Sequence, residues 1–375
     1  MSGKRHIDRL DLLRALAIMM VFFHHYWLII RPEILSSVEP FLYSPFGKLL
    51  FSFHEMGYLG VRLFFVLSGF CIHYSFLNWM ERNGGKLDMR RFLPDYFWRR
   101  FWRIYPPYFA FLVLFFLYQY WEDLDFAAVK HFLVHATLSH TLGKAFYYNI
   151  NPSFWSIAVE WQLYMIYPVF LWVRRWKGIR LAFVGATVVS VFAAFAVPQF
   201  TDSFLFQNLP FKYWFEWTLG ALMAERFREG RSVFRFQGWL VLLGLPFCCL
   251  GLHSSNVFDF AIPSLVFAVC IEWVIGLKAR PKFWEKPFVW AGVFSYSTYL
   301  LHQPLQYSIV SLLPEPTWRQ NIVVGTFLLP LALYIPFLAA SYVSFHLIEM
   351  KSVAVGKSIW KRVSKPIPTV QAASR

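Results

Sequence analysis

The sequence predicts an all-α integral membrane protein, and its composition, the length of its apolar stretches and the placement of its charges each support that fold class. Of the 375 residues, 58% are hydrophobic and 15% are charged, with a mean hydropathy of +0.45. Soluble domains carry about 45–50% apolar and about 25% charged residues. Aromatic residues reach 21%, which suits lipid-facing surfaces and interfacial belts. A bilayer is therefore expected to surround most of the chain.

The apolar stretches predict about ten transmembrane helices. A membrane-crossing helix needs about 20 predominantly apolar residues. The two short stretches on either side of residues 253–256 give the weakest signal among those we assign. We expect spans near 10–30, 58–77, 103–121, 153–173, 181–198, 209–225, 237–252, 256–276, 290–311 and 321–348.

Basic residues alternate between the segments that connect these spans. With the N-terminus in the cytoplasm, most of the 36 lysines and arginines fall in six cytoplasmic segments, as the positive-inside rule requires. An even number of spans then places both termini in the cytoplasm. The net charge of +15 is mainly a topology signal, and because it is spread over six segments it argues against a nucleic-acid partner.

The chain is expected to form one membrane-embedded domain, residues 1–357, followed by a basic cytoplasmic tail, residues 358–375, that is disordered. The first span is interrupted by charged residues, which argues against a cleaved signal peptide. The cysteines fall within predicted spans and lack metal-binding spacing, so we interpret them as small core residues and expect no metal site. They are Cys71, Cys248, Cys249 and Cys270.

Ionisable residues inside a membrane span are costly and usually functional. Arg14 and His25 lie 11 residues apart, so helical periodicity puts them on one face, roughly 16 Å apart along the axis. This face suggests a polar path that leads from the cytoplasmic side toward the far half of the bilayer. The alternative is that both side chains only make hydrogen bonds between helices. His24 points away from this face and is the weaker candidate.

Arginines cluster at the start of the third span. Arg100 and Arg103 lie one helical turn apart, and a guanidinium can bind phosphate oxygens in a bidentate manner. They therefore suggest a site for an anionic ligand, although anchoring of the helix at the cytoplasmic surface would explain each one equally well.

A carboxylate lies inside the fourth span. Glu160 shares a helix face with Ser156 and Tyr164, which are four residues before and after it. Such a group must be paired, protonated or hydrated. It is therefore either a functional residue or a structural partner for an arginine or histidine of another helix.

Two further polar residues are candidates. Ser68 lies in the stretch 57–70, whose glycines permit close helix packing, but it lacks the G-x-S-x-G pattern of a nucleophile. His302 lies in the outer half of the ninth span, level with His25. A helix kink at Pro304 would also account for the local sequence around His302.

Five motifs in order give the chain a family resemblance. They are Arg-x10-His in the first span, Gly-Val-x-x-Phe-Phe-x-Leu-Ser-Gly-Phe in the second, Arg-x-x-Arg-Ile-x-Pro in the third, Phe-Trp-Ser-x-x-x-Glu-x-x-x-Tyr in the fourth and Tyr-x-x-Tyr-Leu-x-His-x-Pro in the ninth. Together they resemble the membrane-bound acyltransferase-3 family, across the chain from Arg14 to Glu349.

The resemblance implies an activity. Such bacterial inner-membrane proteins move an acyl group from cytoplasmic acyl-CoA, usually acetyl-CoA, to a hydroxyl of a cell-surface, lipid-linked or secreted carbohydrate. Acyl-CoA is then a donor substrate, and no permanently bound cofactor is expected. The expected partners are membrane lipid and the carbohydrate, whereas protein partners remain unidentified. Some members modify small molecules such as antibiotics, which leaves that acceptor class open.

The resemblance also suggests residue roles. His25 corresponds to the family's essential histidine, and it is expected to act as a general base or to carry the acyl group transiently. Glu160 is expected to orient that imidazole or to help hold the acceptor. The residues expected to hold the CoA phosphates are Arg14, Arg100 and Arg103, and those expected to contact substrate are Ser68, Tyr164 and His302.

A transporter or flippase is the competing function class. Ten spans with buried histidine, arginine and glutamate are also typical of secondary transporters. The chain shows no internal repeat, which argues mildly against that class. Consumption of acyl-CoA would distinguish a transferase from a transporter.

Overall fold

The structure is a computed structural model that describes residues 8–42, 44–85, 87–234, 256–277, 281–313, 321 and 323–364. In these ranges the regular secondary structure consists of helices without any strand, which confirms the all-α prediction. Five segments are long and apolar enough to cross a membrane, and Ala261–Gly276 is a shorter apolar helix. The five are Arg9–Pro32, Leu59–Arg82, Met89–Tyr120, Phe154–Phe200 and Val324–Val363.

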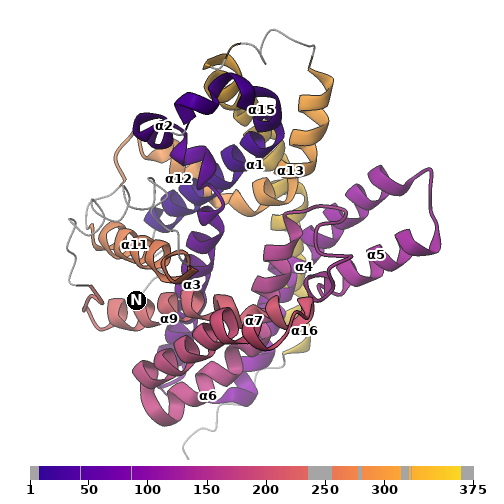
Figure 1. Cartoon of the computed structure of the whole chain (residues 1–375). Coiled ribbons are helices and arrows are strands. Elements are labelled where there is room, and N and C mark those ends of the chain that lie inside the picture. Colours follow the sequence, from indigo (N-terminus) through magenta and orange to yellow (C-terminus); the bar gives the residue numbers. More distant parts are fainter. Residues whose placement is uncertain are drawn as a thin grey trace, which may run out of the picture.

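Figure 1 shows how the helices are arranged, coloured along the chain. In order they are α1 (Asp8–Leu42), α2 (Pro45–Glu55), α3 (Leu59–Arg82), α4 (Met89–Tyr120), α5 (Phe126–Ala136), η1 (His140–Leu142), α6 (Phe154–Val191), η2 (Phe192–Ala196), α7 (Val197–Phe200), α8 (Phe204–Gln207), η3 (Pro210–Tyr213), α9 (Trp214–Arg228), α11 (Asn256–Gly276), α12 (Lys286–Val293), α13 (Ser295–Leu312), η4 (Val324–Leu328), α15 (Leu329–Ser344), η5 (Phe345–Glu349) and α16 (Met350–Val363).

The predicted spans at 153–173 and 181–198 fall in one long helical segment, Phe154–Phe200. A straight helix of its 47 residues would be about 70 Å long, more than twice the thickness of a hydrocarbon core. Gly178, however, has φ +79° and ψ 167°, a conformation that only glycine adopts without strain, and the helix is interrupted there. The segment is therefore two helices joined at Gly178. The predicted span at 237–252 lies outside the described residues.

The C-terminal helix extends further than expected. We expected a disordered tail from residue 358, whereas α16 continues through Val363. The Trp98 indole of α4 donates to the Gly356 carbonyl at 2.8 Å, and its ring packs 5.6 Å from that of Trp360. These contacts with α4 fix residues that the sequence alone gave no reason to order. Residues 365–375 lie outside the described ranges.

Glycines bring α3 and α9 into close contact. A Cβ added at Gly69 would collide with the carbonyl oxygen of Trp217, and one added at Gly220 would collide with that of Val66. On the other side of α3, a Cβ at Gly60 would lie 2.5 Å from the Ala17 carbonyl oxygen of α1. The predicted close packing of the glycine-containing second span is therefore present, and it forms a central group of α1, α3 and α9.

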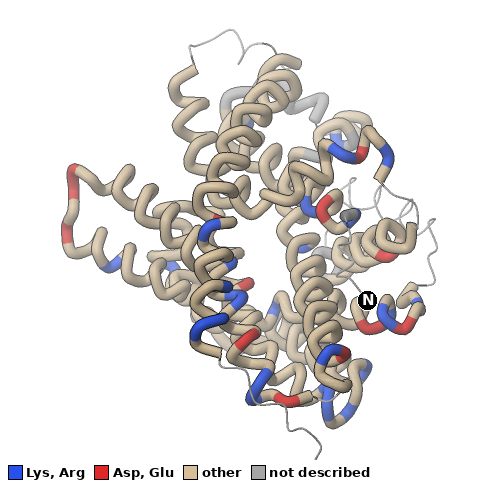
Figure 2. The backbone as a smooth tube through the Cα atoms, turned by 180° about the vertical axis from the view of Figure 1, so that it is seen from behind, with Lys and Arg blue, Asp and Glu red and all other residues tan. Residues whose placement is uncertain are grey.

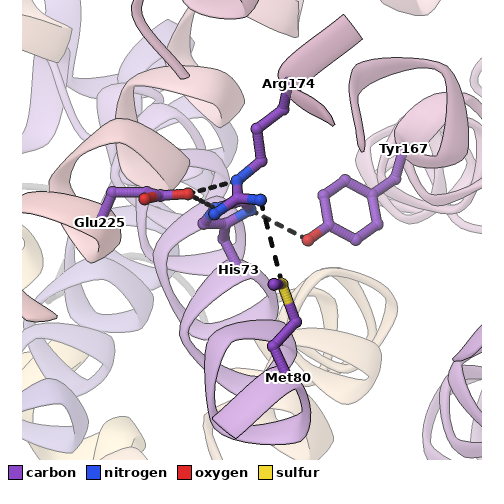
Figure 3. Close-up of polar contacts among 5 residues, drawn as sticks. All are labelled: His73, Met80, Tyr167, Arg174 and Glu225. Carbon is purple, nitrogen blue, oxygen red and sulfur yellow. Dashed lines mark hydrogen bonds and ion pairs between the residues drawn. The ribbon is translucent and has the colours of Figure 1, made fainter. Parts of the chain in front are cut away.

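A buried polar network joins α3, α6 and α9 (Figure 3). His73 is fully buried, with Nδ1 3.0 Å from the Tyr167 hydroxyl and Nε2 3.0 Å from Glu225 Oε1. Arg174 of α6 also bonds Glu225 and lies over the Phe76 ring at 5.2 Å. Because each of these polar side chains bonds a partner on another helix, the network fixes how the three helices pack.

Positive charge gathers at one end of the helix group (Figure 2). The Arg228–Glu81 ion pair joins the C-terminal ends of α9 and α3, close to the Arg174–Glu225 pair. We call this region, with the basic residues of 82–103, 174–180 and 226–231, the basic end. The first turns of α3 and α9 point toward the opposite end, as does the last turn of α4.

Candidate functional site

A cavity of about 240 Å³ lies among α1, α3, α4, α6 and α13. It contains side chains from helices far apart in sequence, and six of the eight predicted site residues line it. We call it the arginine cavity. The six predicted residues are Arg14, Ser68, Arg100, Arg103, Glu160 and Tyr164.

Three guanidinium groups give the arginine cavity a net positive charge. Arg14 is held by Asp11, and its Nη2 lies 3.0 Å from the Cys71 sulfur. Arg100 has a buried Nε without a hydrogen-bond partner among the described residues. Arg103 is exposed at the cavity wall, which places it at the mouth. Donors that are held in place and not fully satisfied suit an anionic ligand.

Glu160 is bound within its own helix and to α3. The Tyr164 hydroxyl donates to Glu160 Oε1, and the Ser68 hydroxyl lies 3.1 Å from the Tyr164 oxygen. Because the tyrosine proton goes to the carboxylate, Ser68 donates to Tyr164. The described hydrogen bonds of Ser68 include no imidazole that could activate it. This arrangement holds the carboxylate at the wall of the arginine cavity.

Two histidines from distant helices contact each other. His25 Nδ1 lies 3.1 Å from His302 Nε2 and 2.9 Å from the Val21 carbonyl oxygen. His302 Nδ1 lies 2.7 Å from the Tyr299 carbonyl oxygen, so it must carry the proton and leave Nε2 as an acceptor. His25 Nδ1 thus faces two acceptors and carries its own proton. A neutral His25 is then left with a free lone pair on Nε2, the form that a general base requires.

The expected partnership between Glu160 and His25 is absent from the described contacts. His302 occupies the position beside His25, while Glu160 is engaged with Tyr164. The reason is the register of α6. The residue of this region that reaches His302 is Ser153, at the start of the helix, and Glu160 lies about two turns further toward the basic end.

Polar groups lie between the arginine cavity and the histidine pair. Ser156 and Tyr299 line the cavity, and their hydroxyl oxygens lie 2.6 Å apart. The Tyr299 hydroxyl is also 3.1 Å from the Ser153 carbonyl oxygen. The Ser153 hydroxyl in turn lies 3.3 Å from His302 Nε2 and donates to Gln303. Polar groups of Ser156, Tyr299 and Ser153 therefore follow one another from the cavity to the histidine pair.

Sequence reasoning missed three residues of this site. Ser153 directly precedes the motif of the fourth span and Tyr299 stands in that of the ninth, but nothing in the sequence showed that they would meet. Cys71 was interpreted as a small core residue, whereas it lines the arginine cavity beside Arg14. Cys71 lies three residues after the candidate Ser68, on the same helix face, and this spacing is a signal that could have identified it. No group of three or more metal-ligating side chains occurs in the described ranges.

A family model described as an acyltransferase domain matches residues 7–343. The chain belongs to the acyltransferase-3 family. Most of the chain is therefore an acyltransferase domain, and its apolar helices make it a membrane protein. The arginine cavity and the histidine pair together form its candidate active site.

Three curated relatives resemble this acyltransferase at low identity. Peptidoglycan O-acetyltransferase OatA of Listeria monocytogenes is 24% identical over 87% of this chain and 54% of its own length. The putative peptidoglycan O-acetyltransferase YrhL of Bacillus subtilis is 25% identical over 80% of this chain and 49% of its own. Nodulation protein 10 of Rhizobium leguminosarum is 23% identical over 86% of this chain and 89% of its own length. The chain spans about half the length of the first two. No solved structure matches it.

Proposed function

We propose that this acyltransferase moves an acyl group, in the first instance acetyl, from acyl-CoA to a hydroxyl group of a cell-envelope carbohydrate. The observation that carries the proposal is the short separation between the arginine cavity and the His302–His25 pair, which the polar groups of Tyr299 and Ser153 span. The names of two relatives, which specify O-acetylation of peptidoglycan, support a carbohydrate acceptor.

The arginine cavity suits the reactive end of acyl-CoA. The cavity has a volume of about 240 Å³. Pockets that enclose a whole drug-sized ligand are larger, at about 300–1,000 Å³. We therefore place the acyl thioester and pantetheine arm inside the cavity and the phosphates at its mouth. Arg103 is exposed there, and Arg100 lies one turn away on α4. Guanidinium groups bind phosphate oxygens through paired hydrogen bonds.

The chemical step requires a base at the acceptor hydroxyl. His25 Nε2 takes the hydroxyl proton as the oxygen attacks the thioester carbonyl carbon. The carbon–sulfur bond then breaks, the acyl oxygen ester forms, and the proton passes from His25 to the CoA sulfur. The products are the O-acyl carbohydrate and free CoA. His302 positions His25, because its Nε2 accepts a hydrogen bond from the Nδ1–H of His25.

The proposal includes an orientation in the membrane. The basic end faces the cytoplasm of a bacterial cell, where acyl-CoA is available, because positively charged segments are retained on that side. The opposite end then faces the outer side of the inner membrane, where envelope carbohydrates are found. Both termini are cytoplasmic under this arrangement.

Cys71 offers a direct test of the donor site. Its sulfur lies in the arginine cavity, so bound acyl-CoA should shield it from a small maleimide. In a full-length variant with Cys248, Cys249 and Cys270 replaced by alanine, acetyl-CoA should slow the labelling of Cys71. The acetyl-CoA concentration for half-protection should rise about tenfold in Arg100→Gln, because one charge-assisted contact is worth about 1.4 kcal/mol.

Arg175→Gln is the matched control, because Arg175 is an exposed arginine of the basic end that does not line the cavity. Its half-protection concentration should equal that of the parent. Labelling that is unaffected by saturating acetyl-CoA would remove the donor assignment. The acceptor class is tested separately by mass spectrometry of O-acyl groups on envelope glycans. One O-acyl species should be missing both in cells that make His25→Ala and in cells without the protein.

A further inference from the structure

A second cavity lies at the end of the molecule opposite the basic end. Its volume is about 620 Å³, and its walls come from the last turn of α4, the segment that precedes α6 and the C-terminal half of α13. We call it the tyrosine cavity. Four of its lining residues are tyrosines, namely Tyr118, Tyr120, Tyr148 and Tyr307.

His302 lies on α13 between the residues that line the two cavities. Along α13, Tyr299 lines the arginine cavity, His302 follows, and Pro304 and Tyr307 line the tyrosine cavity. The chain before α6 repeats this order in reverse. There, Pro152 lines the tyrosine cavity, Ser153 contacts His302, and Ser156 lines the arginine cavity. Ligands in the two cavities would therefore approach the histidines from opposite sides.

The chemistry of the tyrosine cavity differs from that of the arginine cavity. Among its described lining residues there is no lysine, arginine, aspartate or glutamate. Instead it offers aromatic rings together with hydroxyl and amide groups, including those of Asn149 and Ser311. Tyr118, Tyr148 and Tyr307 are 68%, 64% and 48% exposed, so their rings and hydroxyls are accessible. Such a surface matches a ligand with apolar faces and many hydroxyls but without charge.

One wall of this cavity is built at a conformational cost. Ile150 has φ +62°, which is a genuine outlier for a β-branched residue. Gln119 donates to its carbonyl oxygen at 2.7 Å, and the Asn151 amide donates to the Leu300 carbonyl at 3.1 Å. Strained backbone persists where the surroundings enforce it, and it concentrates at functional sites. The strained backbone at Ile150 therefore indicates that the shape of the tyrosine cavity is important for its function.

We propose that the tyrosine cavity is the acceptor site, and that it binds an uncharged saccharide chain and presents one hydroxyl to His25 from the side opposite the acyl donor. This inference rests on the proposed function. The rings of Tyr148 and Tyr307 pack against the apolar faces of the sugar, and the hydroxyl and amide groups of the cavity bind its hydroxyls. The absence of charged groups in the described wall selects against charged saccharides.

Direct binding tests this site. The full-length protein is placed in lipid nanodiscs, because detergents with sugar head groups would compete, and no acyl-CoA is added. The neutral probes are the tetramers of N-acetylglucosamine and of glucose. The charged probes are the cationic glucosamine tetramer and an anionic uronic acid tetramer. At least one neutral tetramer should bind more tightly than both charged ones.

Substitutions then locate the binding. Tyr148→Ala and Tyr307→Ala should each weaken binding of the neutral tetramer about tenfold, because each removes a ring worth about 1–1.5 kcal/mol. Both side chains are exposed, so folding should be retained. Trp176→Ala removes a 66% exposed aromatic residue at the basic end and should not change the affinity.

The outcomes separate this inference from the proposed function. Failure of both neutral tetramers to bind, tighter binding of a charged tetramer, or unchanged affinity in both tyrosine variants would each overturn the acceptor site. The proposed donor site would survive any of these results if acetyl-CoA still protects Cys71 in the tyrosine variants. Loss of that protection in the parent protein would instead count against the proposed function, whatever the saccharide results.

Discussion

His302 is the residue whose role depends most directly on the tertiary structure. Its Nδ1 proton is fixed by the Tyr299 carbonyl, and its Nε2 lies 3.1 Å from His25 Nδ1. His302→Phe keeps a planar ring but removes the acceptor. His25 then keeps the Val21 carbonyl, 2.9 Å from Nδ1, as its remaining acceptor. The base is therefore retained, but one of the two contacts that orient it is lost.

The magnitude follows from that lost contact. A net hydrogen bond contributes about 0.5–1.5 kcal/mol, and misorientation of the base adds to this. We expect a loss of about 2 kcal/mol of transition-state stabilisation, or about 30-fold in kcat, with the KM for acyl-CoA unchanged. His25→Ala should cost more, about 10²–10⁴-fold, because it removes the base itself. His302→Gln offers an amide oxygen as acceptor and should recover part of the loss.

The assay measures the initial rate of CoA thiol release by the purified full-length protein at varied acyl-CoA concentrations. His346→Phe is the matched control, since His346 is exposed and packs on Tyr342, with ring centroids 4.4 Å apart. A kcat for His302→Phe within twofold of the parent value would refute the positioning role. So would equal losses in His302→Phe and His302→Gln accompanied by a lower Tm, because that pattern indicates a packing defect.

Three further predictions concern stability. Glu225→Ala leaves Arg174 and His73 without their shared carboxylate and should destabilise the fold by about 3 kcal/mol, measured as a lower Tm. An unchanged Tm would show that the network is not needed for stability. Gly220→Val places a side chain against the backbone of α3 and should cost about 1–3 kcal/mol, which an unaltered thermal melt would contradict. Burial lowers the pKa of His135 in α5 to about 4, so the unfolded chain binds more protons below pH 6.5. Stability should therefore fall by about 3 kcal/mol from pH 6.5 to pH 4, and His135→Phe should weaken this dependence; identical pH profiles would exclude the effect.

The sequence by itself determined the helical fold, several membrane spans and the family. Apolar stretches fixed the spans at 10–30, 58–77 and 103–121 because a bilayer leaves the backbone no partner except its own helix. Helical periodicity placed Arg100 beside Arg103 and Glu160 beside Tyr164, and the structure has both pairs lining one cavity. These features are local, since they depend only on residues within about one turn of each other.

Only the tertiary structure decided which helices meet. The contact between His25 and His302 joins residues 277 positions apart, and the place of Cys71 beside Arg14 could not be predicted either. In a membrane, lipid-facing and buried helix surfaces are both apolar, so hydrophobic patterns do not identify the face that packs. Close approach at small residues such as Gly69 decides it instead, and that approach fixes which polar side chains come together.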